Sequence, residues 1–308
     1  MTWFFIALLA PVFWSISTHF DKYILSRYSK RGGMESVFLF STFFSLIFAL
    51  FIFSIKYNEI ISYSEYQNIL LFVIPGILNA LGLYFYLKSL KNEESSIVVA
   101  LFQVSPVFAY FLSYLILGEI LTKIQIFASI IILLGATILS FNIEEKRKIL
   151  VKWEMVRYIL LAALFFALND VIFKEFTISH GSFITSLFYQ HIGIFIVGLL
   201  FFLFKKHYKE DFILLLKNNK IKIFVLNGAT ELSYVLGNLI SNFVMLSVPV
   251  ALVLIVNTYQ TVFTFTIGLL LTLFLPHIVT EKISKRHLIQ KILAITIIII
   301  GSYFLYLS

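Results

Sequence analysis

Five polar side chains recur with helical spacing inside one long apolar stretch of the chain. The stretch runs from Ile221 to Leu246, and its polar residues follow one another at steps of four, three, four and four: Asn227, Glu231, Tyr234, Asn238 and Asn242. Residues at these steps lie on one face of an α-helix. A carboxylate near the middle of a membrane helix costs about 2.5–3.5 kcal/mol or more unless it faces protein or water. We therefore expect this polar stripe to line an interior pathway, in which Glu231 binds a proton or a cationic group.

Three further ionisable side chains lie within apolar stretches. Asp170 stands one helical turn before Lys174, so the two could instead form an ion pair that neutralises both. His191 lies in the middle of another apolar stretch, where it could carry protons or only make packing hydrogen bonds. His19 lies near the end of the first stretch, at a gate or at the depth of the lipid headgroups.

Amide and hydroxyl side chains complete the interior polar set. Asn257 and Gln260 share one broad face of the ninth apolar stretch, and Asn79, Tyr86 and Gln103 belong to the first half of the chain. These groups can hydrogen-bond a solute. Polar side chains also join membrane helices without any role in solute binding, so both interpretations stay open for them.

The composition requires that these residues lie in a membrane protein. Of 308 residues, 60% are hydrophobic and only 13% are charged, too few charges to cover the surface of a soluble domain. Segments of about 20 apolar residues can cross a bilayer. Ten segments qualify, at 3–25, 35–55, 67–88, 96–117, 123–142, 156–176, 183–204, 221–243, 247–274 and 287–307. We therefore predict an all-α integral membrane protein, with a short amphipathic helix at the membrane surface in the longest loop, 205–220.

Basic residues are distributed very unevenly between the loops. The loops after the odd-numbered segments hold 21 of the 24 Lys and Arg residues, and only Lys56, Lys123 and Lys174 fall on the other side. The positive-inside rule places the basic side in the cytoplasm. We predict a multi-pass protein of the cell (inner) membrane with both termini outside the cytoplasm. Because the charges follow the membrane topology, the net charge of +8 does not indicate a nucleic-acid partner.

The second half of the chain resembles the first. A shift of 152 residues lays Gly76 on Gly228, Asn79 on Glu231 and Thr18 on Asp170. Two repeats of five helices each must have opposite orientations, an architecture typical of secondary transporters. We predict two such repeats, 1–150 and 151–308, as inverted halves.

Several classes of site are not expected. The chain has no cysteine, which excludes thiolate metal sites and disulfides. It shows no phosphate-binding glycine loop, no cluster with metal-ligand spacing and no Ser–His–Asp set. We expect no cofactor, no metal and no enzymatic activity.

One segment carries a family resemblance. From Pro106 to Gly135 the sequence reads PVFAYFLSYLILGEILTKIQIFASIIILLG, and Gly118-Glu119, Thr122 and Gln125 fit a P…LGExxTxxQ…G pattern. This segment resembles the end of the five-helix repeat of EamA-type transporters in the drug/metabolite transporter superfamily. Ala128 departs from the pattern, and the second repeat lacks the LGExxT signature. Many members of the family also have cytoplasmic termini, contrary to the charge distribution here.

The resemblance implies a secondary transporter with its site between the two repeats. We expect export or import of a small polar or zwitterionic metabolite, such as an amino acid, by alternating access. Protons and membrane lipid are the other expected partners, and the protein would be a monomer or homodimer. The alternative is a flippase in which the polar stripe passes a lipid-linked headgroup.

Overall fold

The computed structural model describes residues 2–28, 34–63, 66–92, 98, 101–140, 153–218, 220–274 and 285–307. Regular structure within these ranges is helical, which confirms the predicted all-α class. The helices are α1 (Thr2–Ala7), α2 (Leu9–Tyr28), α3 (Met34–Tyr63), α4 (Tyr66–Asn92), α6 (Ser105–Leu117), α7 (Lys123–Ser140), α8 (Trp153–His180), α9 (Phe183–Phe204), α10 (Lys206–Asn218), α11 (Lys220–Met245), α12 (Val250–Asn257), α13 (Gln260–Phe274) and α14 (Lys285–Tyr306). The predicted boundary between the halves, at residue 150, lies outside the described residues.

Eight segments of the described chain are long and apolar enough to cross a membrane. The chain is therefore a multi-pass membrane protein. The predicted number of ten is confirmed only in part. The predicted fourth span corresponds to α6, which has 13 residues, and the predicted eighth corresponds to α11, which carries the polar stripe. The predicted amphipathic helix in the longest loop is present as α10, where Tyr208 is buried and Phe212 packs against the bundle.

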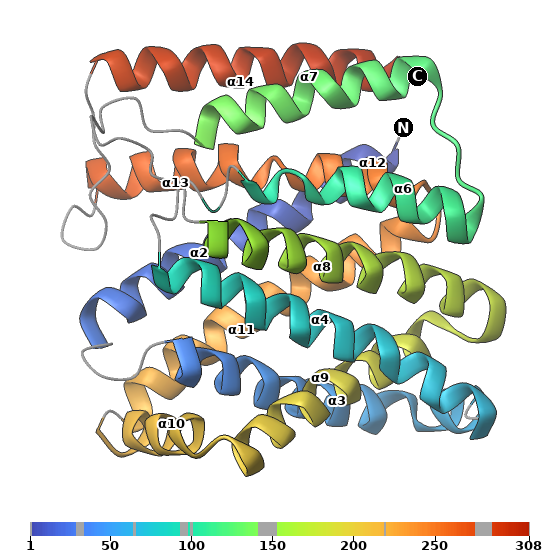
Figure 1. The fold of residues 1–308 in the computed structure, drawn as a ribbon, viewed down its shortest axis with the longest axis vertical. Helices are drawn as coiled ribbons and strands as arrows, with labels where there is room; N and C mark the ends of the chain where they lie inside the picture. The colour runs from blue at the N-terminus through green and yellow to red at the C-terminus, as the bar shows by residue number, and fades with distance from the viewer. Residues whose placement is uncertain are drawn as a thin grey trace.

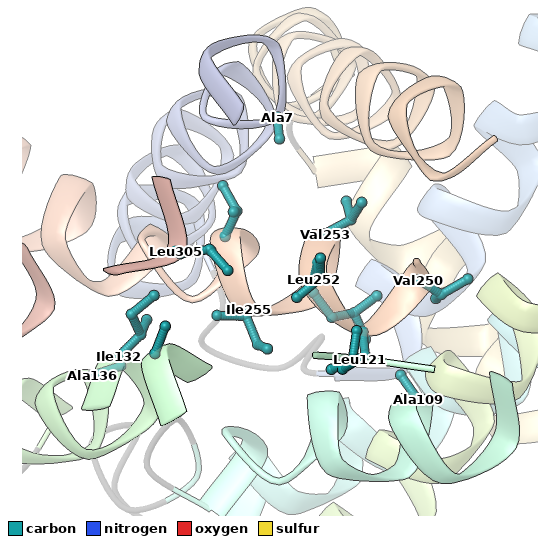
Figure 2. Close-up of a cluster of buried hydrophobic side chains, with 14 of the residues drawn as sticks. Ala7, Ala109, Leu121, Ile132, Ala136, Val250, Leu252, Val253, Ile255 and Leu305 are labelled. Carbon is teal, nitrogen blue, oxygen red and sulfur yellow. The ribbon is translucent and has the colours of Figure 1, made fainter. Parts of the chain in front are cut away.

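The predicted ninth span, 247–274, agrees with the membrane-length segment Val250–Phe274, but the helix in it is not continuous. The structure has two helices there, α12 and α13, separated by a turn at Thr258 and Tyr259. The hydroxyl of Thr258 donates a 2.7 Å hydrogen bond to the carbonyl oxygen of Ile255, an alternative to the regular helical pattern. Irregular backbone at membrane depth requires cover by protein, and Val250 to Val256 are all buried. Figure 2 shows side chains of α12 packed among residues from α1, α6, α7 and α14.

The bundle has two ends that differ in what they carry. In Figure 1 both chain termini lie at the right, where α6 leads to α7 and α8 leads to α9. We call this the termini end. The opposite end, where α2, α4 and α7 finish, is followed by most of the basic loop residues, and we call it the basic end.

Helices of the two halves pack mainly on each other. The most extensive pairs are α4 with α8, α7 with α14, α3 with α9, and α2 with α11. Under the 152-residue shift α2 corresponds to α8 and α11 to α4, so the α2–α11 and α8–α4 pairs are equivalent. This exchange is what two inverted repeats require, and the inverted relation itself remains a prediction.

The α7–α14 pair shows the same reciprocity in its glycines. A Cβ atom added to Gly135 would lie 2.7 Å from Cγ1 of Ile298, and one added to Gly301 would lie 2.8 Å from Cγ1 of Ile132. A shift of 166 residues lays Gly135 on Gly301 and Ile132 on Ile298. Each glycine therefore faces the isoleucine that corresponds to the one in its own helix. Each glycine lets the facing helix approach closely.

Candidate functional site

The polar stripe faces the interior of the bundle, as its spacing predicts. Asn227, Glu231 and Asn242 are 4%, 7% and 4% exposed. Another face of α11 is apolar and exposed, and it includes Val225, Leu232 and Phe243. A helix with this division buries its polar side in protein and presents its apolar side to lipid.

Glu231 lies at the meeting point of several helices. Its Oε1 atom accepts a short hydrogen bond from the hydroxyl of Ser41 on α3. Tyr234, one turn further along α11, lies within electrostatic range of Glu231, of Asp170 on α8 and of Tyr86 on α4. Carboxylates from two different helices therefore lie within electrostatic range of the same phenol.

Trp14 on α2 is a site residue that the sequence analysis missed. Its indole Nε1–H donates to Oδ1 of Asn238 at 3.1 Å and to the carbonyl oxygen of Tyr234 at 3.2 Å. A Cβ atom on Gly237 would lie 2.5 Å from that nitrogen, so the glycine is what allows the indole to reach α11. Helical spacing could not pair these residues, because they are more than 200 positions apart.

A chain of amide hydrogen bonds leads to Asp170. Asn242 donates to Gln190 at 3.2 Å, Gln190 donates to Asn169 at 2.8 Å, and Asn169 donates to the carboxylate of Asp170 at 2.7 Å. Each side-chain NH₂ group donates to the next member of the chain, and the last one donates to the carboxylate. The chain connects α11, α9 and α8. Of its members, Asp170 was predicted as a site residue and Asn242 as part of the polar stripe.

Lys174 does not neutralise Asp170 in the way that their spacing allowed. Its Nζ atom lies 2.5 Å from Oε1 of Glu119 and donates to the carbonyl oxygen of Val248 at 2.8 Å. The expected pair within one helix is therefore replaced by a pair between the two halves of the chain. Within the described part of the chain, the carboxylate of Asp170 is hydrogen-bonded to the amide of Asn169 instead.

His19 and Gln260 lie in the seam between α2 and α13. Gln260 Nε2 donates to the hydroxyl of Thr18 at 3.2 Å, and His19 Nε2 donates to the carbonyl oxygen of Thr264 at 3.0 Å. Polar contacts of this type join membrane helices. The structure thus places both predicted residues in a helix–helix contact.

His191 lies against α3. The ring is 4% exposed and stands edge-on to Phe48, with the ring centroids 4.7 Å apart. Among the described residues its Nδ1 atom has no hydrogen-bond partner. This placement agrees better with a packing role than with proton transfer.

The remaining predicted amides occupy three separate places. Asn257 ends α12, and its Nδ2 atom donates to Ser241 Oγ on α11 at 3.0 Å. Its Oδ1 atom is buried and has no hydrogen-bond partner within the part of the chain that the structure describes. Asn79 is buried on α4, and Gln103 is half-buried in the turn before α6.

One surface hollow of about 440 Å³ lies away from these groups. It is lined by Lys123, Ile124, Phe127, Phe304 and Leu307 on α7 and α14. Its lining is almost wholly apolar and it opens outward, as expected for a surface that meets lipid chains. The described residues hold no group of His, Asp and Glu that could bind a metal ion.

Comparisons with known proteins agree with the LGE motif. The model of the EamA-like transporter family matches residues 1–141, which confirms the family resemblance in the first half of the chain. An uncharacterized transporter of Clostridium kluyveri is 30% identical over 144 residues, which are 46% of this chain and 44% of the relative. The match thus spans less than half the length of that relative.

A solved crystal structure shows the same fold over nearly the whole chain. It has a TM-score of 0.64 and 13% sequence identity, and the match covers 99% of this chain and 96% of that one. At this identity the likeness concerns the fold alone.

Proposed function

We propose that this multi-pass membrane protein, whose residues 1–141 match the EamA-like transporter family, is a secondary transporter of a small solute. The solute is a small polar or zwitterionic metabolite, such as an amino acid. The observation that carries the proposal is the buried carboxylate of Glu231 on the inward face of α11, which accepts a hydrogen bond from Ser41 and shares the surroundings of Tyr234 with Asp170 of α8. Ionisable groups within membrane-spanning segments are costly, and they commonly mark solute or ion pathways.

The chemistry of this space suits a solute with an ammonium group. Glu231 and Asp170 attract a positive charge or exchange it for protons. The phenol of Tyr234 and the amides of Asn257 and Asn227 offer hydrogen bonds to the polar remainder of the solute. The Trp14 indole is already bound to Asn238, so it holds α2 against α11 and shapes one wall.

Alternating access would use the two halves of the chain as inverted five-helix repeats. The exchanged pairs α2–α11 and α8–α4 support this, as do the reciprocal contacts of Gly135 and Gly301. In such an architecture the solute site lies between the repeats, and one repeat rocks against the other.

The function is tested by the substitution Glu231→Gln. Thermal-shift measurements with amino acids and amines first identify solutes that stabilise the purified protein. We expect wild-type proteoliposomes to accumulate such a solute when a pH gradient drives them. The variant keeps the shape of the side chain but not its titration, so it should lose pH-driven accumulation and keep its melting temperature.

A matched control is Glu210→Gln, which removes an exposed carboxylate on α10 and should leave accumulation unchanged. If Glu231→Gln still concentrates the solute against its gradient, Glu231 is structural. If no solute of these classes is moved by the wild-type protein, the substrate class is wrong.

The orientation proposed from the charges has its own test. With 21 of 24 basic residues on one side, both termini should face away from the cytoplasm. Alkaline phosphatase fused after Ser308 should then be active, and green fluorescent protein fused there should be dark. Bright fluorescence in intact cells would reverse the orientation and leave the fold untouched.

A second candidate function is movement of a lipid-linked headgroup. The sparse contact between α3 and α11 favours it, because a headgroup that passes between leaflets must enter from the side. Transbilayer movement of a fluorescent lipid in proteoliposomes, with solute accumulation absent, would favour this candidate over the solute transporter.

A further inference from the structure

Glu119 and Lys174 form a buried ion pair between the two halves of the chain at the termini end. Glu119 follows α6, and Lys174 belongs to α8. Their side chains are 11% and 9% exposed, and the Nζ–Oε1 distance is 2.5 Å. Burying two charges is costly unless the geometry is close and the remaining hydrogen-bonding positions are used.

Here the remaining positions are used by a third element, the start of α12. Lys174 Nζ donates to the carbonyl oxygen of Val248 at 2.8 Å, and Glu119 Oε2 accepts the backbone N–H of Val250 at 2.9 Å. The pair thus hydrogen-bonds to the N-terminus of α12. The carbonyl oxygen of Val248 accepts one bond, and the N–H group of Val250 donates the other. A carboxylate at a helix N-terminus also interacts favourably with the helix dipole.

The backbone of Glu119 is itself fixed by the end of α6. Gly118 adopts a left-handed conformation with φ of 67°, which a residue with a side chain rarely adopts. The N–H groups of Gly118 and Glu119 both bond to the carbonyl oxygen of Ser113. A Cβ on Gly118 would meet nothing within 4 Å, so this glycine serves the turn and not a close helix contact.

The short helix α12 connects the ion pair to the site. Its eight residues span about 12 Å at 1.5 Å per residue. Its first residue, Val250, bonds to Glu119, and its last, Asn257, bonds to Ser241 on α11. Figure 2 shows Val250, Leu252, Val253 and Ile255 of α12 within a cluster of buried hydrophobic side chains.

We propose that Glu119 and Lys174 are a latch that closes the termini end of the transport path and opens once in each transport cycle. Helix α12 transmits the opening of this latch to Asn257 at its other end. The proposal rests on the proposed transport function, since only alternating access requires this end to open. In the structure the latch is closed.

The test uses the absence of cysteine in the natural sequence. A single reporter, Val250→Cys, replaces a residue that is 0% exposed directly below the latch. Its reaction rate with a water-soluble maleimide is measured in proteoliposomes without solute. Lys174→Gln should raise this rate at least about tenfold, because a buried carboxylate that has lost its partner drives the closed arrangement apart. Lys174→Arg, which keeps the charge, should restore slow labelling.

Two controls separate opening from unfolding. Lys56→Gln breaks the exposed pair between Lys56 and Glu59, whose side chains are 51% and 31% exposed, and it should leave the rate unchanged. A second reporter, Ala80→Cys, replaces a residue 0% exposed in the core formed by α3, α4 and α9, and it should stay slow in Lys174→Gln.

An unchanged rate at Val250→Cys would overturn the latch. Equal acceleration at both reporters would show that the pair holds the fold instead of a gate, which also overturns it. The labelling requires no substrate. The labelling can therefore overturn the latch while Glu231-dependent transport stands. A failure of the transport assay leaves the labelling rates unchanged, so the two failures are distinguishable.

Discussion

The contact of α4 with α9 and the contact of α11 with α3 are equivalent under the 152-residue shift, but only the first is closed. A Cβ atom on Gly76 would lie 1.9 Å from the carbonyl oxygen of Gln190 and 2.8 Å from Cα of Gly193. A Cβ atom on Gly228, the counterpart of Gly76, would meet nothing within 4 Å. The backbones of α4 and α9 are in contact at Gly76, whereas the space beside Gly228 on α11 is open.

If the protein works by the proposed alternating access, this difference corresponds to one of the two states of the cycle. Gly193 corresponds to Ser41 under the same shift, and Asn79 corresponds to Glu231. Where α4 and α9 meet through two glycines, α11 and α3 are joined by the hydrogen bond from Ser41 to Glu231. In the proposed cycle the open contact closes when the closed contact opens, so Gly228 approaches Ser41 as Gly76 now approaches Gly193. Substitutions at these positions should separate effects on the fold from effects on the cycle.

The largest expected effect is the loss of stability in Gly76→Ala. Its added methyl group collides with backbone atoms, which cannot rotate away as a flexible side chain can, so α4 and α9 must separate. Overpacking of this kind costs about 1–3 kcal/mol or more. We expect a clearly lower melting temperature for the purified protein.

The matched variant Gly228→Ala should have the opposite sign. It enters open space, and alanine inside a helix is about 0.5–1 kcal/mol more favourable than glycine. Its melting temperature should be equal to or higher than that of the wild type. If both variants lose the same stability, the two contacts do not differ as described.

A larger side chain at Gly228 should affect the cycle and not the fold. A Cβ atom at Gly228 has no neighbour within 4 Å, so we expect the melting temperature of Gly228→Leu to stay within a few degrees of the wild type. If α11 must close on α3, the side chain blocks that state, and the transport rate should fall about tenfold or more, as for a minor state disfavoured by 1.4 kcal/mol. An unchanged rate would show that this contact never closes.

Local spacing predicted much of the site, because helical periodicity depends only on neighbours in sequence. The stripe from Asn227 to Asn242 faces the interior as its steps required. Spacing failed where the partner is distant. Lys174 stands one turn from Asp170 and yet pairs with Glu119, 55 positions away. No periodic signal connects those two residues.

The fold, like the site, could be predicted only where it depends on residues that are close in sequence. The shift of 152 residues describes the α2–α11 and α4–α8 pairs, but Gly135 and Gly301 require 166, since extra residues precede α14. The turn at Thr258 lies between Asn257 and Gln260, whose spacing fits one face of a continuous helix as well as it fits a turn. That turn depends on the burial of α12 by neighbouring helices, which no single segment reveals.

The smallest expected effect concerns the hydrogen bond between Ser41 and Glu231, which joins α3 to α11. Ser41→Ala removes the hydroxyl that donates to Glu231, while Glu231 keeps its other interactions. Hydrogen bonds between membrane helices contribute about 0.6 kcal/mol on average, so the melting temperature should fall only slightly. Because few other contacts join α3 to α11, the loss should also loosen this contact and speed labelling of Gly228→Cys by a water-soluble maleimide. Ser54→Ala is the control, since Ser54 bonds only to its own helix at Phe51 and should change neither quantity. If Ser41→Ala leaves labelling at Gly228→Cys unchanged, the bond to Glu231 does not hold α3 and α11 together, and the open contact must be maintained by the packing around it.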